Sequence, residues 1–341
     1  MDKTTRIANH FLSFSKKECR ESSRLYELLS LQIAKEDELL NLCLMAKKGK
    51  PTPNLLFASV HYLLLAGKEH PLKAFYSSMV KTSRDPDDAF PYFIDFCRQH
   101  KEEIVHLLKT KSVQTNEVRR CAYLYPVFCY VYDLVKKPLS VIEIGTSAGL
   151  NLLWDQFRYS YGTPNRYGCQ HSPIHLTSKV RGNTSPSFHT VSPPVVFKAG
   201  IDLNIIDLQK KEDYLWLESL IWPEHDERRR IMKDAAKMLK NQSVHLVEGD
   251  GVAILDTLVQ QAPDNSAVCI FHTHVANQIP EESKQKLIAQ IEMIGRTRDV
   301  FHIYNNMWDP KLHLDYYIDG QETKKIVGET DGHGRWFTWE L

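Results

Sequence analysis

Hydrophobic residues recur every three or four positions through most of the first 136 residues, as they do along one face of an amphipathic helix. The segment "SSRLYELLSLQIAKEDELLNLCLMA" has this spacing, and "PTPNLLFASVHYLLLAG" begins with prolines and ends at Gly67, as helices commonly do. The segment "TNEVRRCAYLYPVFCYVYDLV" is apolar on most faces, which predicts a buried helix despite Pro126. We therefore expect an all-α N-terminal domain over residues 1–136.

Short apolar runs alternate with helical patterns from residue 140 onwards. Strands are predicted at "LSVIEIG", "VVFKAGIDLN", "SVHLVEGD", "SAVCIFHTHV" and "DVFHIYNN", and helices between them at "AGLNLLWDQFRYSYG", "KEDYLWLESLIWPEHDERRRIMKDAAKMLKN", "GVAILDTLVQQ" and "PEESKQKLIAQIEMIGR". The alternation predicts an α/β domain over residues 137–341, with a doubly wound, mostly parallel sheet. The last segment, "KKIVGETDGHGRWFTWEL", predicts an antiparallel hairpin that turns at "DGHG".

The stretch "VIEIGTSAGLNL" changes from strand to helix through a turn with little side-chain bulk. Gly145 can adopt a positive φ without steric cost, and the missing side chains let a ligand lie against the backbone. In an open parallel sheet, ligands bind beyond the carboxyl ends of the strands, near the point where the strand order reverses. The N–H groups that open the next helix favour a carboxylate or a phosphate there. The sequence therefore predicts a ligand site at this turn.

The residues Glu143, Gly145, Ser147 and Gly149 form the pattern E-x-G-x-S-x-G. This pattern resembles the first motif of class I S-adenosylmethionine-dependent methyltransferases, with Ser147 in place of the middle glycine. Its third small residue follows the second by two positions and not by three, which disfavours a dinucleotide-binding oxidoreductase. Small residues at a strand-to-helix turn can also serve only to relieve crowding.

The resemblance implies further contacts with S-adenosylmethionine as cofactor. It implies that Asp202, in "GID", holds the ribose hydroxyls, that Asp250, in "EGD", lies near the adenine amino group, and that "FHTH" faces the transferred methyl group. Either carboxylate could instead cap the helix that follows it. The resemblance implies a Rossmann-like methyltransferase-type fold with seven strands, the last of which form the hairpin.

The distance from Gly149 to Asp202 is 53 residues, whereas a simple βαβ unit places its acid about 20 residues after the glycines. An insertion rich in proline and serine, at about residues 162–193, accounts for the difference. It could form a lid, a substrate loop or an excursion without a role.

The chain as a whole is identified as a member of an uncharacterised bacterial family, domain-of-unknown-function family 2332. The segments that carry this resemblance span nearly the full length: "LLFASVHYLLL", "HPLKAFY", "TNEVRRCAYL", "EIGTSAGLNLLWDQFRY", "AGIDLNIIDL", "WLESLIWPE", "EGD" and "HGRWFTW". Membership implies a methyltransferase-like fold behind a helical N-terminal region, and it names no activity.

His272 and His274 lie two positions apart on a predicted strand, so we expect their side chains on the same side. They could be a general base and its partner for a methyl acceptor, because neutral imidazole accepts protons near pH 7. They could also be structural histidines. A metal site has less support, since no third ligand stands at a recognisable spacing.

The segment "TNEVRR" opens the last helix before the glycine turn, and it brings Asn116, Glu117 and Arg120 together. In methyltransferases of this kind a helix often lies over the cofactor, so the resemblance implies that Asn116 and Arg120 contribute to the cofactor site. Arg120 could pair with the methionyl carboxylate. The plainer alternative is a helix cap with a surface arginine.

Three functions follow from these observations. The first is an S-adenosylmethionine-dependent methyltransferase that acts on a small-molecule or other acceptor. The second is a non-enzymatic nucleoside-binding or partner-docking protein that keeps the fold, since a fold does not establish a chemistry. The third is a serine hydrolase, because "GTSAG" around Ser147 fits G-x-S-x-G in its letters.

The composition of the chain limits the kinds of partner and the cellular location that we expect. The formal charge of +1, from 43 basic and 42 acidic residues, argues against a broad nucleic-acid surface. The seven cysteines are scattered and form no C-x-x-C pair, which fits a reducing cytosol. The N-terminus lacks the apolar segment of a signal peptide, and no apolar run approaches the 18 residues of a membrane span. We expect a cytoplasmic protein.

Overall fold

The computed structural model describes residues 2–47 and 49–341, and the chain forms two compact units. One comprises Met1–Thr115 and Asp207–Arg230 and is called the helical unit below. The other comprises Asn116–Ile206 and Ile231–Leu341 and is called the sheet unit. The division into domains 1–136 and 137–341 stays a prediction, and the compact units divide the chain at other positions.

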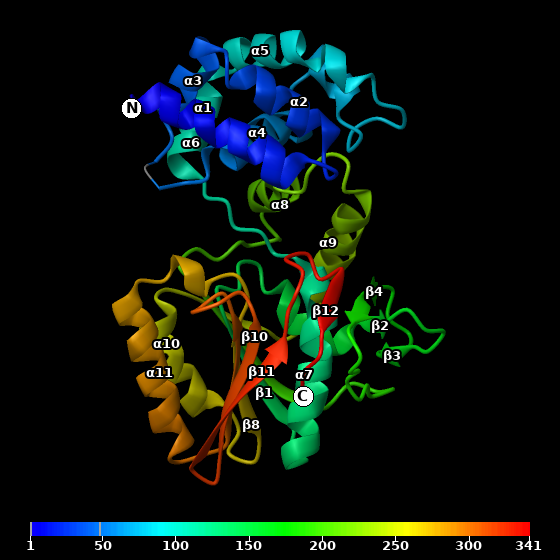
Figure 1. Cartoon of the computed structure of the whole chain (residues 1–341), viewed down its shortest axis with the longest axis vertical. Helices are drawn as coiled ribbons and strands as arrows, with labels where there is room; N and C mark the ends of the chain where they lie inside the picture. Colours follow the sequence, from blue (N-terminus) through cyan, green and yellow to red (C-terminus); the bar gives the residue numbers. More distant parts are fainter. Residues whose placement is uncertain (1, 48) are drawn as a thin grey trace. The chain divides into compact units, whose positions relative to one another are not determined.

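The helical unit is built from helices in its described residues (Figure 1). The α-helices are α1 (Lys3–Phe14), α2 (Arg24–Ile33), α3 (Asp37–Cys43), α4 (Thr52–Leu65), α5 (Ala89–Gln99), α6 (Lys101–Thr110), α8 (Lys211–Ser219) and the start of α9 (Asp226–Leu239). Shorter turns are η1 (Ser15–Cys19), η2 (Pro71–Phe75) and η3 (Pro86–Asp88). The segment "KEDYLWLESLIWPEHDERRRIMKDAAKMLKN" forms two helices and not one, because the chain breaks around Pro223, between α8 and α9.

Aromatic rings form the core of the helical unit. The rings of Tyr26 and Phe57 stack with centroids 4.2 Å apart, and Trp222 meets Tyr26 edge-on at 5.8 Å. The indole N–H of Trp216 donates to the backbone oxygen of Ser112 at 2.9 Å. These contacts join the segment 207–230 to the N-terminal helices, and both tryptophans therefore serve packing.

The sheet unit contains a seven-stranded, mostly parallel sheet in the order β11-β10-β9-β8-β1-β6-β7. Its strands are β1 (Leu139–Ile144), β6 (Val195–Asp202), β7 (His245–Glu248), β8 (Ala267–His272), β9 (Val300–Asn305), β10 (Leu312–Ile318) and β11 (Gln321–Gly328). Strand β1 lies inside the sheet and pairs in parallel with β6 and β8. The chain proceeds from β1 to β6 and β7 on one side and then crosses to β8 and β9 on the other, so the strand order reverses at β1.

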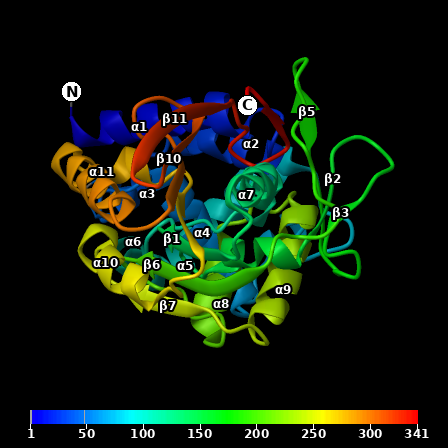
Figure 2. The ribbon, with the colours of Figure 1, turned by 90° about the horizontal axis from the view of Figure 1, so that it is seen from below.

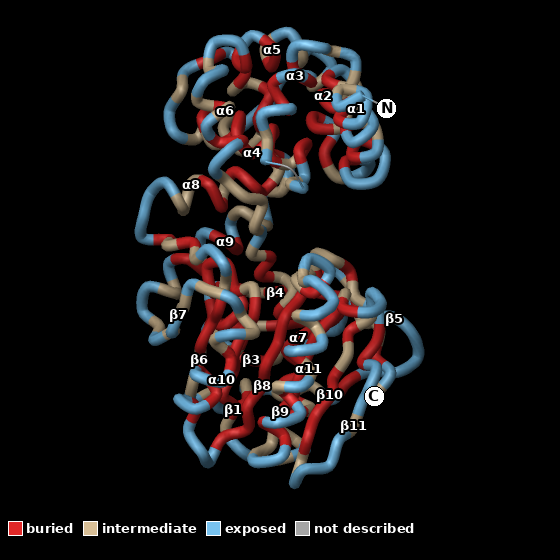
Figure 3. Tube along the Cα trace, turned by 90° about the vertical axis from the view of Figure 1, so that its left-hand side faces the viewer, coloured by how far each residue is buried: buried red, intermediate tan, exposed pale blue. Residues whose placement is uncertain are grey.

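Helices cover both faces of this sheet (Figures 1 and 2). On one face, α10 (Gly251–Gln261) and α11 (Glu281–Gly295) pack on apolar residues of β1, β6, β8 and β9. On the other face lies α7 (Cys121–Val135), and its Phe128 meets Phe271 of β8 edge-on with centroids 5.6 Å apart. Because both faces are covered, every residue of β1, β8 and β9 is buried (Figure 3).

The antiparallel edge of the sheet uses other residues than the sequence suggested. Strands β10 and β11 form it, and they turn at Asp319 and Gly320, which both have positive φ. At "DGHG" the chain does fold back, with hydrogen bonds from Asp331 N to Trp336 O and from Thr338 N to Glu329 O. This turn stays outside the main sheet, since β12 (Trp336–Thr338) pairs in parallel with β5 (Lys179–Arg181).

The helix predicted after the glycine turn is wrong. A 3₁₀ segment, η5 (Leu150–Gln156), and a short strand, β2 (Arg158–Ser160), follow β1 instead. The reason is that α7 already covers this face: Trp154 stacks on Phe128 of α7 with centroids 4.2 Å apart. The predicted insertion is not wholly irregular, because β3 (Tyr167–Gly168) and β4 (His175–Thr177) join β2 in a three-stranded sheet.

Helix α7 is buried and contains Pro126, as predicted. A proline lacks the N–H that would donate to the carbonyl four residues earlier, which is that of Ala122. In the structure the hydroxyl of Tyr161, at the end of the β2 segment, donates to Ala122 O at 2.9 Å. The side chain of Tyr161 thus supplies the donor that the helix itself cannot.

No helix in the described part of the chain combines the length and the apolar character needed to span a membrane.

The Tyr161 hydroxyl gives a stability prediction. Tyr161→Phe leaves the buried Ala122 carbonyl without a donor and should lower the free energy of unfolding by about 1–2 kcal/mol, measured by urea unfolding. In a Pro126→Ala background the restored N–H can reach the same carbonyl, so there Tyr161→Phe should cost less than about 0.5 kcal/mol. Equal losses in both backgrounds would contradict this account.

Candidate functional site

Three alternate residues of the turn after β1 have left-handed conformations. Gly145, Ser147 and Gly149 have φ values of 75°, 54° and 78°. The backbone N–H groups of Gly145 and Thr146 both donate to Ile201 O, at 2.7 and 3.1 Å, so the turn is fixed to the end of β6. Ser147 adopts a conformation that costs a residue with a side chain about 1–2 kcal/mol. A serine here takes the backbone conformation expected of glycine.

Asp202 supports that conformation. Its Oδ2 accepts a hydrogen bond from the Ser147 N–H at 2.8 Å, and its Oδ1 accepts one from the Asn204 N–H at 3.1 Å. The predicted ribose acid therefore lies at the end of β6 beside the turn and holds the middle of it. A carboxylate bound to backbone N–H groups gives shorter and stronger hydrogen bonds than a neutral acceptor.

Glu143, the last acid of β1, is buried directly beneath the turn and is 2% exposed. Thr146 Oγ1 donates to its Oε2 at 2.7 Å, and Asn151 Nδ2 donates to its Oε1 at 3.2 Å. Burial raises the pKa of Glu143 to about 8, although these two hydrogen bonds oppose the shift. Near pH 7 this carboxyl is largely protonated, and both its oxygens are used to organise the turn.

Asn116 and Asp250 have local partners. Asn116 Oδ1 accepts from the Leu150 N–H at 3.0 Å, which brings the segment before α7 to the end of the turn. Asp250 caps α10, because its carboxylate accepts from the N–H groups of Val252 and Ala253 at 2.8 and 3.2 Å. The cap alternative for Asp250 agrees with this geometry.

Apolar side chains of the same chain lie against the glycines of the turn. A side chain added at Gly145 would collide with the methyl groups of Val275, and one added at Gly149 would meet a methyl group of Leu246 at 2.9 Å. Beside them, the Ser147 hydroxyl is buried and has no hydrogen-bond partner among residues 2–47 and 49–341. The turn is therefore closely packed, with one polar atom left over.

The expectation that His272 and His274 face the same side of a strand is wrong. Strand β8 ends at His272, and His274 has a left-handed φ of 57°, so the alternation of side chains stops between them. His272 is fully buried, and its Nε2 lies 3.0 Å from the Nε2 of His302. Burial lowers the pKa of His272 to about 3, so it is a neutral histidine of the interior.

His274 lies with a second group of polar residues, at the carboxyl ends of β8 and β9. Its backbone N–H donates to Asn305 Oδ1 at 2.8 Å, and its Nδ1 lies 3.2 Å from Asn306 Nδ2. Burial first, and the charge of Arg120 second, lower the pKa of His274 to about 3. Its Nε2 is buried and has no partner in the described part of the chain. The imidazole is thus neutral at pH 7, with one nitrogen unused.

Arg120 joins the two groups of residues. Its Nε donates to Gly332 O at 3.0 Å, and its Nη1 lies 3.4 Å from Thr273 O. Its charge also lowers the pKa of Glu143, against the larger effect of burial. The predicted site residues Asn116 and Arg120 therefore both reach the carboxyl edge of the sheet, one at the turn and one beside His274.

Glu117 has a partner that the sequence did not predict, His333, which lies 216 positions away in the chain, and the neighbouring Asp331 and Arg335 were not predicted either. His333 Nδ1 lies 3.2 Å from Glu117 Oε2, and the carboxylate of Asp331 forms an ion pair with Arg335 at 2.7 Å. Glu117 is 5% exposed. The segments "TNEVRR" and "HGRWFTW" both carry the family resemblance, but this gives no reason to expect that Glu117 and His333 lie in contact.

The model of one protein family matches residues 8–339, nearly the whole chain, and describes that family as an uncharacterised protein conserved in bacteria (DUF2332). The chain belongs to the DUF2332 family. No curated protein matches it. The segments that meet at the carboxyl edge of this DUF2332 protein all lie inside the matched range.

The described residues of this DUF2332 chain offer no ready set of metal ligands. Among the described residues, no group of three or more histidines, cysteines, aspartates or glutamates is arranged to hold a metal ion. The carboxylates of Glu143, Asp202 and Asp250 at this edge accept hydrogen bonds from neighbouring side chains and backbone N–H groups.

Glu143 gives a pH prediction. Its pKa in the folded chain, about 8, lies above the 4.5 of an unfolded glutamate, so the folded state holds the proton more tightly. Its contribution to stability is complete below pH 4.5 and is lost as the pH rises towards 8, by roughly 1.4 kcal/mol per unit at most. Glu143→Gln should remove this dependence, because the amide is neutral like the protonated carboxyl group. In urea unfolding, parent and variant should therefore be closest in stability at pH 5, and the variant should gain on the parent at pH 6.5 and again at pH 8. A difference that does not change with pH would refute a protonated Glu143.

Proposed function

We propose that the sheet unit binds S-adenosylmethionine at the carboxyl edge of β1 and β6 and transfers its methyl group to an acceptor placed beside β8. The observation that carries the proposal is the position of the left-handed turn at Gly145–Gly149. It lies at the end of β1, where the strand order reverses, and ligands of open parallel sheets bind at such a point.

The residues at this edge carry polar groups that can form hydrogen bonds with the cofactor. The Asp202 carboxylate, at the end of β6, can accept hydroxyl groups as well as the N–H groups that it already holds. The Ser147 hydroxyl is a buried polar atom without a partner in the described residues, so a bound ligand would satisfy it. When bound, S-adenosylmethionine supplies the activated methyl group.

The remaining residues would position the acceptor. His274 is neutral, and its free Nε2 can make a hydrogen bond to a polar acceptor group, while Asn305 and Asn306 fix its backbone and ring. Arg120 holds Thr273 and Gly332 around it. Because the pKa of His274 is only about 3, orientation of the acceptor is a more natural role for it than storage of a proton.

The close packing of the turn favours a second candidate, a binding or docking protein without catalysis. Val275 and Leu246 lie over the two glycines that the cofactor would approach. The hydrolase alternative loses support, because the Ser147 hydroxyl is buried and no histidine among the described residues accepts its proton.

Asp202 provides the direct test of the cofactor. Titration calorimetry of the whole chain with S-adenosylmethionine should show binding, and Asp202→Ala should weaken it about 10- to 100-fold, because a charge-assisted acceptor is lost. Asp202→Asn keeps an oxygen for Ser147 N–H and separates loss of charge from loss of the turn. Asp256→Ala, an exposed acid on α10, serves as the matched control. Absence of binding in the parent chain would overturn the proposal.

Val275 provides a test of whether the close packing over Gly145 prevents the cofactor from binding there. If the cofactor lies on Gly145, the smaller Val275→Ala side chain should leave the affinity for S-adenosylmethionine unchanged or raise it several-fold, whereas Val275→Phe should abolish binding. Thermal unfolding of both variants reports whether the turn is intact. Weaker binding by Val275→Ala, with an unchanged melting temperature, would show that the Val275 side chain contributes to binding and would contradict the expectation that it obstructs the cofactor.

A further inference from the structure

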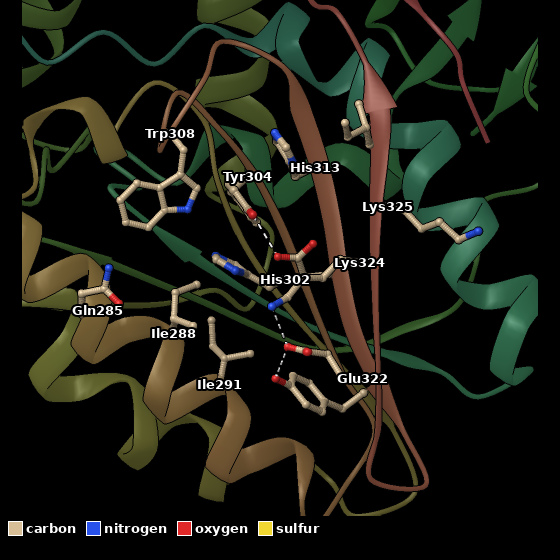
Figure 4. A pocket seen from close by; sticks show the side chains of 13 residues that line it. Gln285, Ile288, Ile291, His302, Tyr304, Trp308, His313, Glu322, Lys324 and Lys325 are labelled. Atoms are coloured by element: carbon tan, nitrogen blue, oxygen red, sulfur yellow. Dashed lines mark hydrogen bonds and ion pairs between the residues drawn. The ribbon is translucent and has the colours of Figure 1, made fainter.

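A pocket of about 500 Å³ lies between α11 and the antiparallel edge of the sheet, away from the glycine turn (Figure 4). One wall is formed by α11, with Gln285, Ile288 and Ile291, and the other by β9, β10 and β11. Its volume falls within the range of small-molecule sites, about 300–1,000 Å³. The proposed function makes no use of this pocket.

The sheet wall is set by the strand register. His302 of β9 lies directly opposite Asp315 of β10, and Asp315 lies directly opposite Lys324 of β11. Directly opposed side chains on one face of a sheet have Cβ atoms about 5 Å apart. An imidazole, a carboxylate and an ammonium therefore stand in one row across the wall.

Asp315 is a nearly buried acid in the sheet wall of the pocket. It is only 8% exposed, and its Oδ2 accepts one hydrogen bond, from the Tyr304 hydroxyl at 2.9 Å. Lys324, its neighbour in the row, instead pairs with Glu322 at 3.0 Å. Asp315 forms no ion pair in the described part of the chain, and burial raises the pKa of its carboxyl group. A ligand that donates an N–H to Asp315 would supply what is missing.

His302 has an unused ring nitrogen. It is fully buried, and its Nδ1 has no hydrogen-bond partner among residues 2–47 and 49–341. Its Nε2 shares a single hydrogen with His272 Nε2, so one ring must donate and the other accept. His302 lines the pocket and His272 does not. The ring that accepts at Nε2 carries its N–H at Nδ1, and a ligand in the pocket that accepts from His302 Nδ1 would favour the arrangement with this N–H on His302.

Apolar and aromatic groups complete the pocket. Trp308 is 50% exposed and Ile326 is 42% exposed, and both line it. The rings of Tyr304 and His313 stack with centroids 5.0 Å apart and an interplanar angle of 6°. Exposed apolar side chains around a few convergent polar atoms are typical of sites for small ring-shaped ligands.

We propose that this pocket binds a planar nitrogen heterocycle that carries an amino group next to a ring nitrogen, as adenine and cytosine do. The amino group donates to Asp315, the ring nitrogen accepts from His302, and the ring packs against Trp308 and the isoleucines of α11. The pocket is a site separate from the carboxyl edge and does not depend on the proposed cofactor.

The test measures binding of adenine and cytosine to the whole chain by titration calorimetry. Purine, which lacks the amino group of adenine, and benzylamine, a cation without the ring nitrogen, are the matched ligands. We expect dissociation constants below about 1 mM for adenine or cytosine and at least tenfold weaker binding of both matched ligands.

Variants locate the ligand. Asp315→Asn and Trp308→Ala should each weaken binding at least tenfold, and Thr323→Ala should leave it unchanged, since Thr323 is absent from the pocket and alternates with Lys324 on β11. Trp308→Ala changes a half-exposed side chain, so it keeps the test valid if Asp315→Asn fails to fold.

Three results would overturn the proposal. They are binding of neither base, equal binding of benzylamine, and binding that is lost in Asp202→Ala but kept in Trp308→Ala. The last result would assign the base to the carboxyl edge. It also separates the two proposals, because each site has its own variant.

Discussion

The hydrogen bond from the Ser147 N–H to the Asp202 carboxylate is the contact on which the carboxyl edge depends. It holds a residue with a side chain in a left-handed conformation, which the isolated backbone disfavours by about 1–2 kcal/mol. It also joins the end of β6 to the turn after β1, and Ile206 N completes the connection by donating to Ser147 O at 3.2 Å. Once the turn is fixed, Leu150 N–H points at Asn116 and the start of α7 is positioned. The same hydrogen bond therefore helps to fix the end of β6, the turn after β1 and the start of helix α7.

The sequence predicted those parts of the fold that repeat a local pattern. The five apolar runs became the parallel strands, and the glycine turn lies at the carboxyl end of β1, where the strand order reverses. The hairpin of β10 and β11 was not predicted, although its signal is also local. Asp319-Gly320 is a strong turn signal, but the alternation of "LHLDYYI" before it was not recognised as a strand. The helix predicted at η5 was wrong for another reason. Helix α7 already occupies the face of the sheet that a helix at this position would cover.

The candidate site was predictable only in part. Glu143, Asp202 and Asn116 could be found from strand ends and helix starts, yet their partners show that they hold the turn in place. The separation of His272 from His274 depends on one left-handed residue after β8, which no periodicity reveals. The contact between Glu117 and His333 joins residues 216 positions apart, and neither segment alone carries a signal for it. Side-chain partners at this distance are set by the tertiary fold.

Pro126 makes the formation of α7 a matter of folding order. The helix contains a gap in its own hydrogen bonding, and the donor that closes the gap, Tyr161, lies 39 residues beyond Ala122. Between them the chain must complete β1, the glycine turn and β2. Helix α7 therefore cannot reach its full stability as an isolated segment. It gains the missing hydrogen bond only when β1 and β2 have formed and Tyr161 is in place. A proline that looks like a local defect makes the helix and the strand fold as one cooperative unit.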